Sequence, residues 1–171
     1  MTSLVVSLAG PDRPGLVNSL SERITAGGGS WLESRLAHLA GTFAGIILVR
    51  VPDEKAKALA AALAAMQESG LAVTILTGTE SAPLPEQVTL ELLGNDRPGI
   101  VREVTQTLRG LGVNIEEFSS HIESAPFTGA EMFHATARLG LPQGVTAEAV
   151  SAALERLTAE FMVDIKTPEP A

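Results

Sequence analysis

The stretch GPDRPGLV occupies residues 10–17, and the chain reads GNDRPGIV at residues 94–101, so six of the eight positions repeat with an offset of 84. The match continues as a pattern, and FAG at 43–45 aligns with FTG at 127–129 under the same offset. Further paired positions are Leu20 and Val104, Ile24 and Leu108, Gly28 and Gly112, Trp31 and Ile115, and Glu33 and Glu117. A repeat this long in 171 residues predicts two similar domains.

The predicted boundaries follow from the repeat and from a stretch with two prolines. GTESAPLPE at 78–86 has the composition of a loop. We therefore expect a first domain at 1–78, a linker at 79–86 and a second domain at 87–171.

Each repeat shows the same order of hydrophobic patterns: a β-rich run, a helical spacing of apolar residues, two strand-like runs, a second helical pattern and a last short strand. The expected strands are 3–9, 31–40, 43–51, 71–77, 87–93, 113–122, 131–139 and 162–166, and the expected second helices are 53–69 and 146–161. The order βαββαβ, twice, predicts an α+β fold of two tandem ferredoxin-like domains, each an antiparallel sheet with its helices on one face. A single doubly wound sheet is the alternative, but that fold requires a helix between the two middle strands of each repeat, where the sequence predicts none.

Composition excludes several classes of protein. The chain has no Cys, which rules out disulfides, thiol nucleophiles and zinc sites built on Cys. Its apolar stretches are interrupted well before about 18 residues, so no membrane-spanning helix is expected. The first residues, MTSLVVSLAGPDRPG, lack the pattern of a signal peptide. These features are compatible with a cytoplasmic protein.

The charge distribution is uneven and disfavours direct binding of nucleic acid. The net charge is −8; residues 1–84 carry 6 basic and 7 acidic residues, and residues 85–171 carry 6 and 13. Neither half has a basic patch that could neutralise several phosphates. Aromatic residues are only 4% of the chain, without Tyr, so a stacking platform for single strands is not expected either.

The repeated phrase stands between the first strand and the first helix of each domain. Asp12 and Asp96 are candidate N-caps, and the following Arg-Pro places Pro14 and Pro98 in the first helical turn. Gly15 and Gly99 come next, and because glycine has no Cβ, another backbone or a ligand can approach closely there. One interpretation is a well-capped helix start; the other is a site for a small zwitterion, whose carboxylate would meet helix amides and whose ammonium would meet an Asp.

The repeat and its two strand–DRPG–helix openings resemble tandem ACT domains, which are amino-acid-sensing regulatory modules. Residues 33–49, ESRLAHLAGTFAGIILV, and 125–139, APFTGAEMFHATARL, are similar to the family of glycine-cleavage transcriptional repressors. The resemblance implies a protein without catalytic activity that senses glycine or a small relative. It also implies control of transcription through a protein partner such as a transcriptional activator.

The resemblance also implies which residues bind the ligand: the loop after the first strand and the start of the second strand. The matching positions are Asp12, Arg13, Gly15 and Ser30 in the first repeat and Asn95, Asp96, Arg97, Gly99 and Asn114 in the second. Asn114 can donate and accept hydrogen bonds, whereas Ser30 is a shorter substitute. The second repeat is therefore predicted to be the better amino-acid site.

Other constellations carry weaker signals. His38, His121 and His134 lack the spacing of a metal site, although His121 and His134 could meet across a hairpin. No metal or cofactor is expected. Exposed sheet edges need cover, so the repeats are expected to pair with each other or the chain to form a homodimer.

Two alternative functions stay open at this point. One is an enzyme-linked role, either a detached regulatory subunit of an amino-acid metabolic enzyme or a hydrolase or isomerase built around His134 with Glu131 or Glu123. The other is an interaction scaffold whose ligand site is vestigial.

Overall fold

The structure is a computed structural model that describes residues 1–79, 86–157 and 161–167. The chain divides into two compact units, Met1–Ser81 and Ala82–Ala171. Most of the predicted linker, 79–86, lies outside the described residues, and its last residue, Glu86, already begins a strand. None of the helices in the described ranges is long and apolar enough to cross a membrane.

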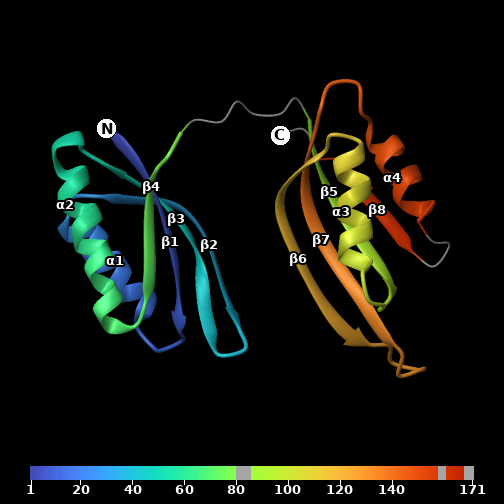
Figure 1. Cartoon of the computed structure of the whole chain (residues 1–171), viewed down its shortest axis with the longest axis horizontal. Helices are drawn as coiled ribbons and strands as arrows, with labels where there is room; N and C mark the ends of the chain where they lie inside the picture. Colours follow the sequence, from blue (N-terminus) through green and yellow to red (C-terminus); the bar gives the residue numbers. More distant parts are fainter. Residues whose placement is uncertain (80–85, 158–160, 168–171) are drawn as a thin grey trace. The chain divides into compact units, whose positions relative to one another are not determined.

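The first unit is a four-stranded antiparallel sheet in the order β2-β3-β1-β4, with its helices on one face (Figure 1). Its elements are β1 (Thr2–Pro11), α1 (Leu16–Ala26), β2 (Ser30–Leu39), β3 (Thr42–Val51), α2 (Asp53–Ala64), the 3₁₀ helix η1 (Ala65–Ser69) and β4 (Ala72–Thr77). The predicted helix at 53–69 is thus an α-helix only as far as Ala64, and its last five residues form the tighter 3₁₀ turn.

The second unit repeats the arrangement with the sheet order β6-β7-β5-β8. Its elements are β5 (Glu86–Asn95), α3 (Ile100–Gly110), β6 (Asn114–Ser124), β7 (Glu131–Leu141), α4 (Ala147–Glu155) and β8 (Met162–Lys166). The predicted fold, two ferredoxin-like βαββαβ domains, is confirmed. The predicted helix at 146–161 is too long, because α4 ends at Glu155; residues 158–160 lie outside the described ranges.

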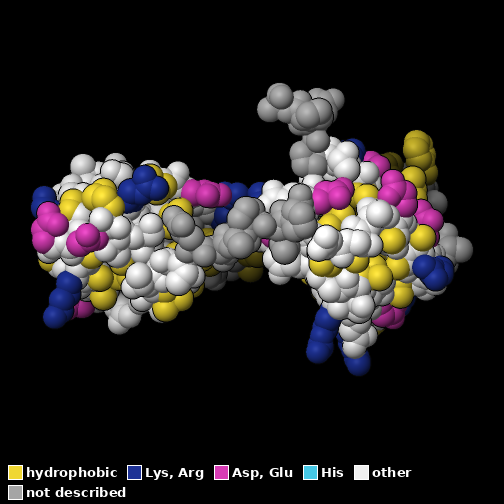
Figure 2. Space-filling view, turned by 90° about the horizontal axis from the view of Figure 1, so that it is seen from above, with side chains coloured by type: hydrophobic (Ala, Val, Ile, Leu, Met, Phe, Trp, Pro, Cys, Tyr) yellow, Lys and Arg dark blue, Asp and Glu magenta, His cyan; other side chains and the backbone are white. Residues whose placement is uncertain are grey.

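Each unit has its own hydrophobic core between the sheet and the helices. In the first, Leu16, Leu20 and Ile24 of α1 are buried at the predicted helical spacing. Ile100, Val104 and Leu108 of α3 do the same in the second. The two cores are separate clusters of buried residues, so each sheet and its helices form an independently packed body. In Figure 2, hydrophobic, basic and acidic side chains are interspersed over the visible surface of each unit.

The repeated phrase forms a β-turn that precedes the helix. In the first copy the amide of Leu16 donates to the Arg13 carbonyl at 3.4 Å, and Gly15 has φ 82° and ψ 2°. In the second copy the amide of Ile100 donates to the Arg97 carbonyl, and Gly99 has φ 88° and ψ 0°. Pro at the second position and a left-handed Gly at the third define a type II turn.

This turn corrects the predicted helix start. The N-caps are Gly15 and Gly99, without a side-chain cap, so the prediction of Asp12 and Asp96 as N-caps is wrong. Pro14 likewise lies in the turn and not in the first helical turn. The chain needs Pro and Gly here for their backbone angles: proline fixes φ, and only glycine adopts the left-handed region without strain.

The turn glycines give a direct test. A Cβ at Gly99 would meet no atom within 4 Å, so Gly99→Ala adds backbone strain alone, which costs about 1–2 kcal/mol in the left-handed region. We expect the second unit to lose about that much free energy of unfolding in urea titrations followed by circular dichroism. Gly110→Ala, also in open space but at a helical position, is the control and should be neutral or stabilising. Equal losses in both variants would contradict this account of the turn.

The hairpins after the first helices differ between the repeats. Ala40 and Gly41, with φ 48° and 79°, join β2 to β3 in a two-residue turn of type I′ geometry. The hairpin of the second repeat is six residues longer: Phe43 pairs with Gly10, whereas Phe133 pairs with Gly94. The alignment of FAG at 43–45 with FTG at 127–129 is therefore wrong. FTG lies in the β6–β7 turn, with Phe127 fully exposed.

The starts of β2 and β6 share one irregularity. The pairing register of β2 with β3 shifts between Trp31 and Glu33, and that of β6 with β7 shifts between Ile115 and Glu117. Here the offset of 84 holds. The shift is a β-bulge in which one extra residue lets Trp31 and Ile115 pack against the core at the strand start.

Candidate functional site

The loop between β1 and α1 borders a cavity of about 150 Å³ in the first unit. Its lining residues are Pro11, Arg13, Leu16, Ser69, Gly70 and Leu71. They come from two segments far apart in the sequence, the β1–α1 loop and the connection from η1 to β4. Gly10 brings the segments together, because a Cβ there would lie 2.9 Å from the Gly70 carbonyl oxygen.

The cavity combines a cation, a hydroxyl oxygen and apolar walls. Among the described residues, no carboxylate pairs with the guanidinium of Arg13. The Ser69 hydroxyl donates to the Met66 carbonyl at 2.7 Å, which leaves the lone pairs of its oxygen available to a donor. Arg13 can therefore bind a carboxylate, and Ser69 Oγ can accept a hydrogen bond from an ammonium group.

Asp12 contacts the β2–β3 hairpin. Its amide donates to the Gly41 carbonyl at 3.0 Å, and its Oδ2 lies 3.8 Å from His38 Nε2. Asp12 does not line the cavity, so the predicted pairing of Asp12 with a ligand ammonium finds no support in the geometry of this pocket. Gly15 is needed for the turn, because its φ of 82° lies in the left-handed region that favours glycine.

The second repeat uses its equivalent arginine differently. The Arg97 guanidinium donates two hydrogen bonds to Glu103, from Nη1 to Oε1 at 2.8 Å and from Nη2 to Oε2 at 2.5 Å. It also lies 5.9 Å from the ring centroid of Phe161. The hydrogen bond from Arg97 lowers the pKa of the Glu103 carboxyl below its usual value, so this glutamate is charged at neutral pH. In the first repeat the position of Glu103 is Ser19, which cannot form such an ion pair.

The other predicted residues of the second loop lie at the end of β5. Asn95 is its last residue and pairs with Met132 of β7, and the Asp96 amide donates to the Glu131 carbonyl at 2.9 Å. Gly99 is the turn glycine. Thus Asn95, Asp96, Arg97 and Gly99 are close in the chain, but the charge of Arg97 is already engaged by Glu103.

Ser30 and Asn114 lie at the opposite end of their sheets from these loops. Ser30 pairs with Arg50, which pairs with Ser3 near the start of β1, whereas the loop follows Pro11 at its end. Eight residues of strand separate the two places, about 26 Å at the usual rise of a strand. Asn114 is placed in the same way in the second unit. A single domain therefore does not combine the predicted loop and strand residues in one site.

His121 and His134, which the sequence indicated could meet across a hairpin, do meet there. They are directly paired across β6 and β7, and their rings lie edge to face with centroids 4.9 Å apart. His121 Nε2 is also 3.6 Å from Glu123 Oε2. No group of three or more His, Asp or Glu residues within the described ranges could hold a metal ion.

Comparison with known proteins identifies the family. The ACT domain family matches residues 2–75 and, a second time, residues 88–149. The chain belongs to the ACT domain family. Each match lies within one βαββαβ unit, so the phrase DRPG lies in the first strand–helix loop of each ACT domain, β1–α1 in the first and β5–α3 in the second.

The relatives of this tandem ACT protein agree with a regulatory role. It is 26% identical to the glycine cleavage system transcriptional repressor of Escherichia coli (strain K12) over 162 residues, which is 92% of this chain and 85% of the relative. A crystal structure of an unknown protein from Galdieria sulphuraria has 29% identity and a TM-score of 0.85 over 98% of this chain and 99% of that one. A second crystal structure, assigned to a glycine cleavage system transcriptional repressor, has 17% identity, covers 98% of both chains with a TM-score of 0.72, and shows the same fold.

Proposed function

We propose that this tandem ACT protein senses a small amino acid, and that the ligand binds in the cavity beside Arg13 of the first ACT domain. The observation that supports the proposal most directly is the position of Arg13, which lines this partly open cavity and has no carboxylate partner among the described residues. An amino acid would place its carboxylate on the guanidinium and its ammonium on oxygen acceptors such as Ser69 Oγ.

The size of the cavity favours glycine or a close relative. A cavity of about 150 Å³ is small, so among amino acids it suits glycine, alanine or serine better than those with large side chains. The walls made by Leu16 and Leu71 are apolar and offer no partner to a charged side chain on the ligand.

This proposal moves the site away from the second repeat. The prediction that the second loop, completed by Asn114, binds better stays a prediction. In the second ACT domain the Glu103 carboxylate takes the place that a ligand carboxylate would need on Arg97. We therefore propose one ligand for each chain.

The regulatory output is proposed from the relatives. Because the Escherichia coli relative is a transcriptional repressor, we propose that ligand binding changes the affinity of this cytoplasmic, non-catalytic chain for a protein partner that acts on transcription. The ligand can do so only by the difference in its affinity for the partner-competent and partner-incompetent states. The net charge of −8 favours a protein partner over nucleic acid.

Thermal denaturation with matched ligands tests the sensing role. Glycine, alanine and serine should raise the melting temperature, because a ligand that binds only the folded state stabilises it. Phenylalanine, which is too large, and glycinamide and N-acetylglycine, which each lack one charge, should have little effect. If none of the twenty amino acids raises the melting temperature, the sensing proposal is overturned and an interaction scaffold is the better account.

A further inference from the structure

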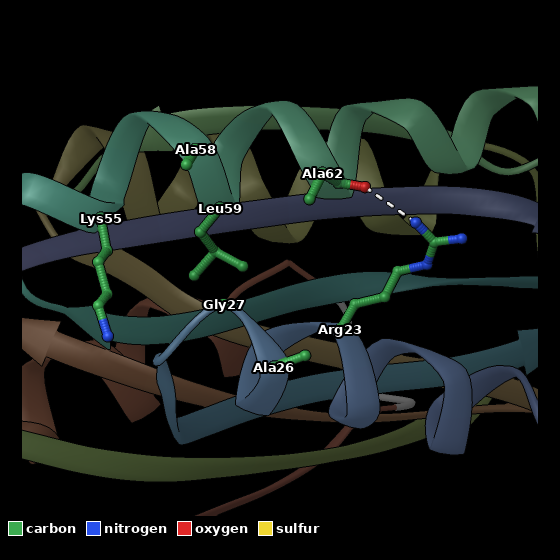
Figure 3. Close-up of a pocket in the computed structure, with 7 residues that line it drawn as sticks. All are labelled: Arg23, Ala26, Gly27, Lys55, Ala58, Leu59 and Ala62. Carbon is green, nitrogen blue, oxygen red and sulfur yellow. Dashed lines mark hydrogen bonds between the residues drawn. The ribbon is translucent and has the colours of Figure 1, made fainter.

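A second cavity, of about 470 Å³, lies between the two helices of the first unit (Figure 3). It is separate from the cavity beside Arg13, with which it shares no lining residue. Its lining residues are Arg23, Ala26, Gly27, Lys55, Ala58, Leu59 and Ala62. We call this cavity the α1–α2 groove.

Small side chains keep the α1–α2 groove open. Ala26 on α1 and Ala58 and Ala62 on α2 carry no atoms beyond Cβ, so the facing sides of the helices leave room between them. Leu59 forms the floor, where its Cδ1 would lie 2.6 Å from a Cβ at Gly27. The surface inside the groove is therefore apolar and suited to close approach of another backbone.

Two cations bracket the apolar floor. Figure 3 shows Arg23 reaching from α1 toward α2, where its NH1 donates to the Ala62 carbonyl at 3.2 Å. Lys55 reaches the other way, and its Nζ would lie 3.0 Å from a Cβ at Gly28. Lys55 and Ala62 are seven residues apart on α2, so the positions that mark the two ends of the groove lie about 10 Å apart along the helix axis.

Neither cation has a carboxylate partner among the described residues. Two acids that lie near them in the sequence have other partners: Glu22 accepts a hydrogen bond from Asn18 at 2.8 Å, and Asp53 accepts one from Thr2 at 2.7 Å. The positive charges of Arg23 and Lys55 are thus available to a molecule that enters the groove.

The equivalent surface of the second repeat lacks both cations. Arg23 corresponds to Thr107 under the offset of 84. If the buried pair Leu59 and Leu63 is matched with Val150 and Leu154, Lys55 corresponds to Thr146, the N-cap of α4. The fold itself therefore does not require a cation at either place.

We propose that the α1–α2 groove binds a helix of a partner protein that carries two carboxylates seven residues apart and small side chains between them. Seven residues of helix span about 10 Å, the same rise that separates Lys55 on α2 from Ala62, whose carbonyl Arg23 contacts. A single amino acid is too short to reach both. The partner's small side chains would rest on Ala58, Leu59 and Ala62, as in other helix-in-groove complexes.

The charge distribution of the chain also directs an acidic partner to this unit. Residues 1–84 carry nearly balanced charge, with 6 basic and 7 acidic residues, whereas residues 85–171 carry 6 and 13. An acidic helix is repelled less by the first unit than by the second, and such long-range fields affect both the choice of surface and the rate of association. The inference does not depend on the proposed amino-acid sensing.

A labelled peptide tests the proposal on the full chain. The probe is an alanine-based helical peptide of about 20 residues with two glutamates seven positions apart, and fluorescence anisotropy measures its binding. We expect saturable binding that the double variant Arg23→Gln/Lys55→Gln weakens at least about tenfold. Lys57→Gln, which removes a cation of α2 that does not line the groove, should leave binding unchanged.

Charge reversal separates the groove from a general electrostatic effect. The variant Arg23→Glu/Lys55→Glu should reject the glutamate peptide and bind a version with lysines at the same two positions. Equal binding of a glutamine peptide, equal weakening by Lys57→Gln, or no saturation at millimolar peptide would each overturn the proposal. Tight binding of suberate, sensitive to the same double variant and unmatched by the peptide, would overturn it in favour of a dicarboxylate site.

Discussion

Arg13→Ala should weaken glycine binding about tenfold to a hundredfold, whereas Arg97→Ala should leave it unchanged. A hydrogen bond between charged groups contributes about 1.5–3 kcal/mol, which is the basis of that range. The two arginines hold the same place in the repeated phrase, but of these two only Arg97 is paired with a carboxylate of the described residues, that of Glu103. Isothermal titration calorimetry of the two variants beside the parent chain measures the difference, and the parent should bind one glycine for each chain.

The matched pair also decides between the two repeats. Ser30→Ala and Asn114→Ala, at the far ends of their sheets, should keep the parent affinity. If Asn114→Ala abolishes binding while Arg13→Ala does not, the site belongs to the second repeat as the sequence first indicated. Arg13→Lys should recover part of the affinity, because it restores the charge without the planar pair of donors.

Leu20→Ala should destabilise the first unit by about 2–5 kcal/mol and leave the second unit unaffected. Leu20 is fully buried, and shortening a fully buried leucine removes its contacts and leaves a cavity. The core of the first unit shares no residue with that of the second. Thermal unfolding should therefore separate into two transitions, the earlier one belonging to Met1–Ser81.

Amide hydrogen exchange assigns the loss to a unit. Val17→Ala, in the same helix but 44% exposed, is the control and should change the free energy of unfolding by less than about 0.5 kcal/mol. Faster exchange of α3 and β7 amides in Leu20→Ala, to the same extent as in α1 and β1, would show that the two units unfold together and contradict the prediction.

The fold could be predicted because the repeat and the spacing of hydrophobic residues both indicate which side chains are buried. The spacing of Leu16, Leu20 and Ile24 fixes which face of α1 meets the sheet, and the second copy supplies an independent reading of the same pattern. The N-cap prediction was wrong because Asp is a common cap, whereas the backbone angles of Pro-Gly decide the geometry here. The alignment of FAG at 43–45 with FTG at 127–129 was wrong because it assumed the same offset of 84 throughout. The second hairpin is six residues longer, so the offset changes within it.

The candidate site could be predicted only in part. The sequence points to the loop with Arg13, but Ser69 and Leu71, which close the cavity, lie more than fifty residues away and carry no motif. The ion pair between Arg97 and Glu103 had one indication in the sequence: the second copy has an acid where the first has Ser19. The sequence alone could not show that the two side chains meet, because the type II turn is what brings Arg97 back over the first turn of α3.

The bulge at the start of β2 and β6 is one of the features that the two ACT domains share. Both copies shift register at the same position, and both have the Arg-Pro-Gly turn, as two copies of one duplicated domain would. The features that differ are the ion pair of Arg97, the longer hairpin and the cations of the α1–α2 groove. The two copies thus diverge at the charge of one shared arginine: Glu103 neutralises that of Arg97, whereas no carboxylate of the described residues neutralises that of Arg13.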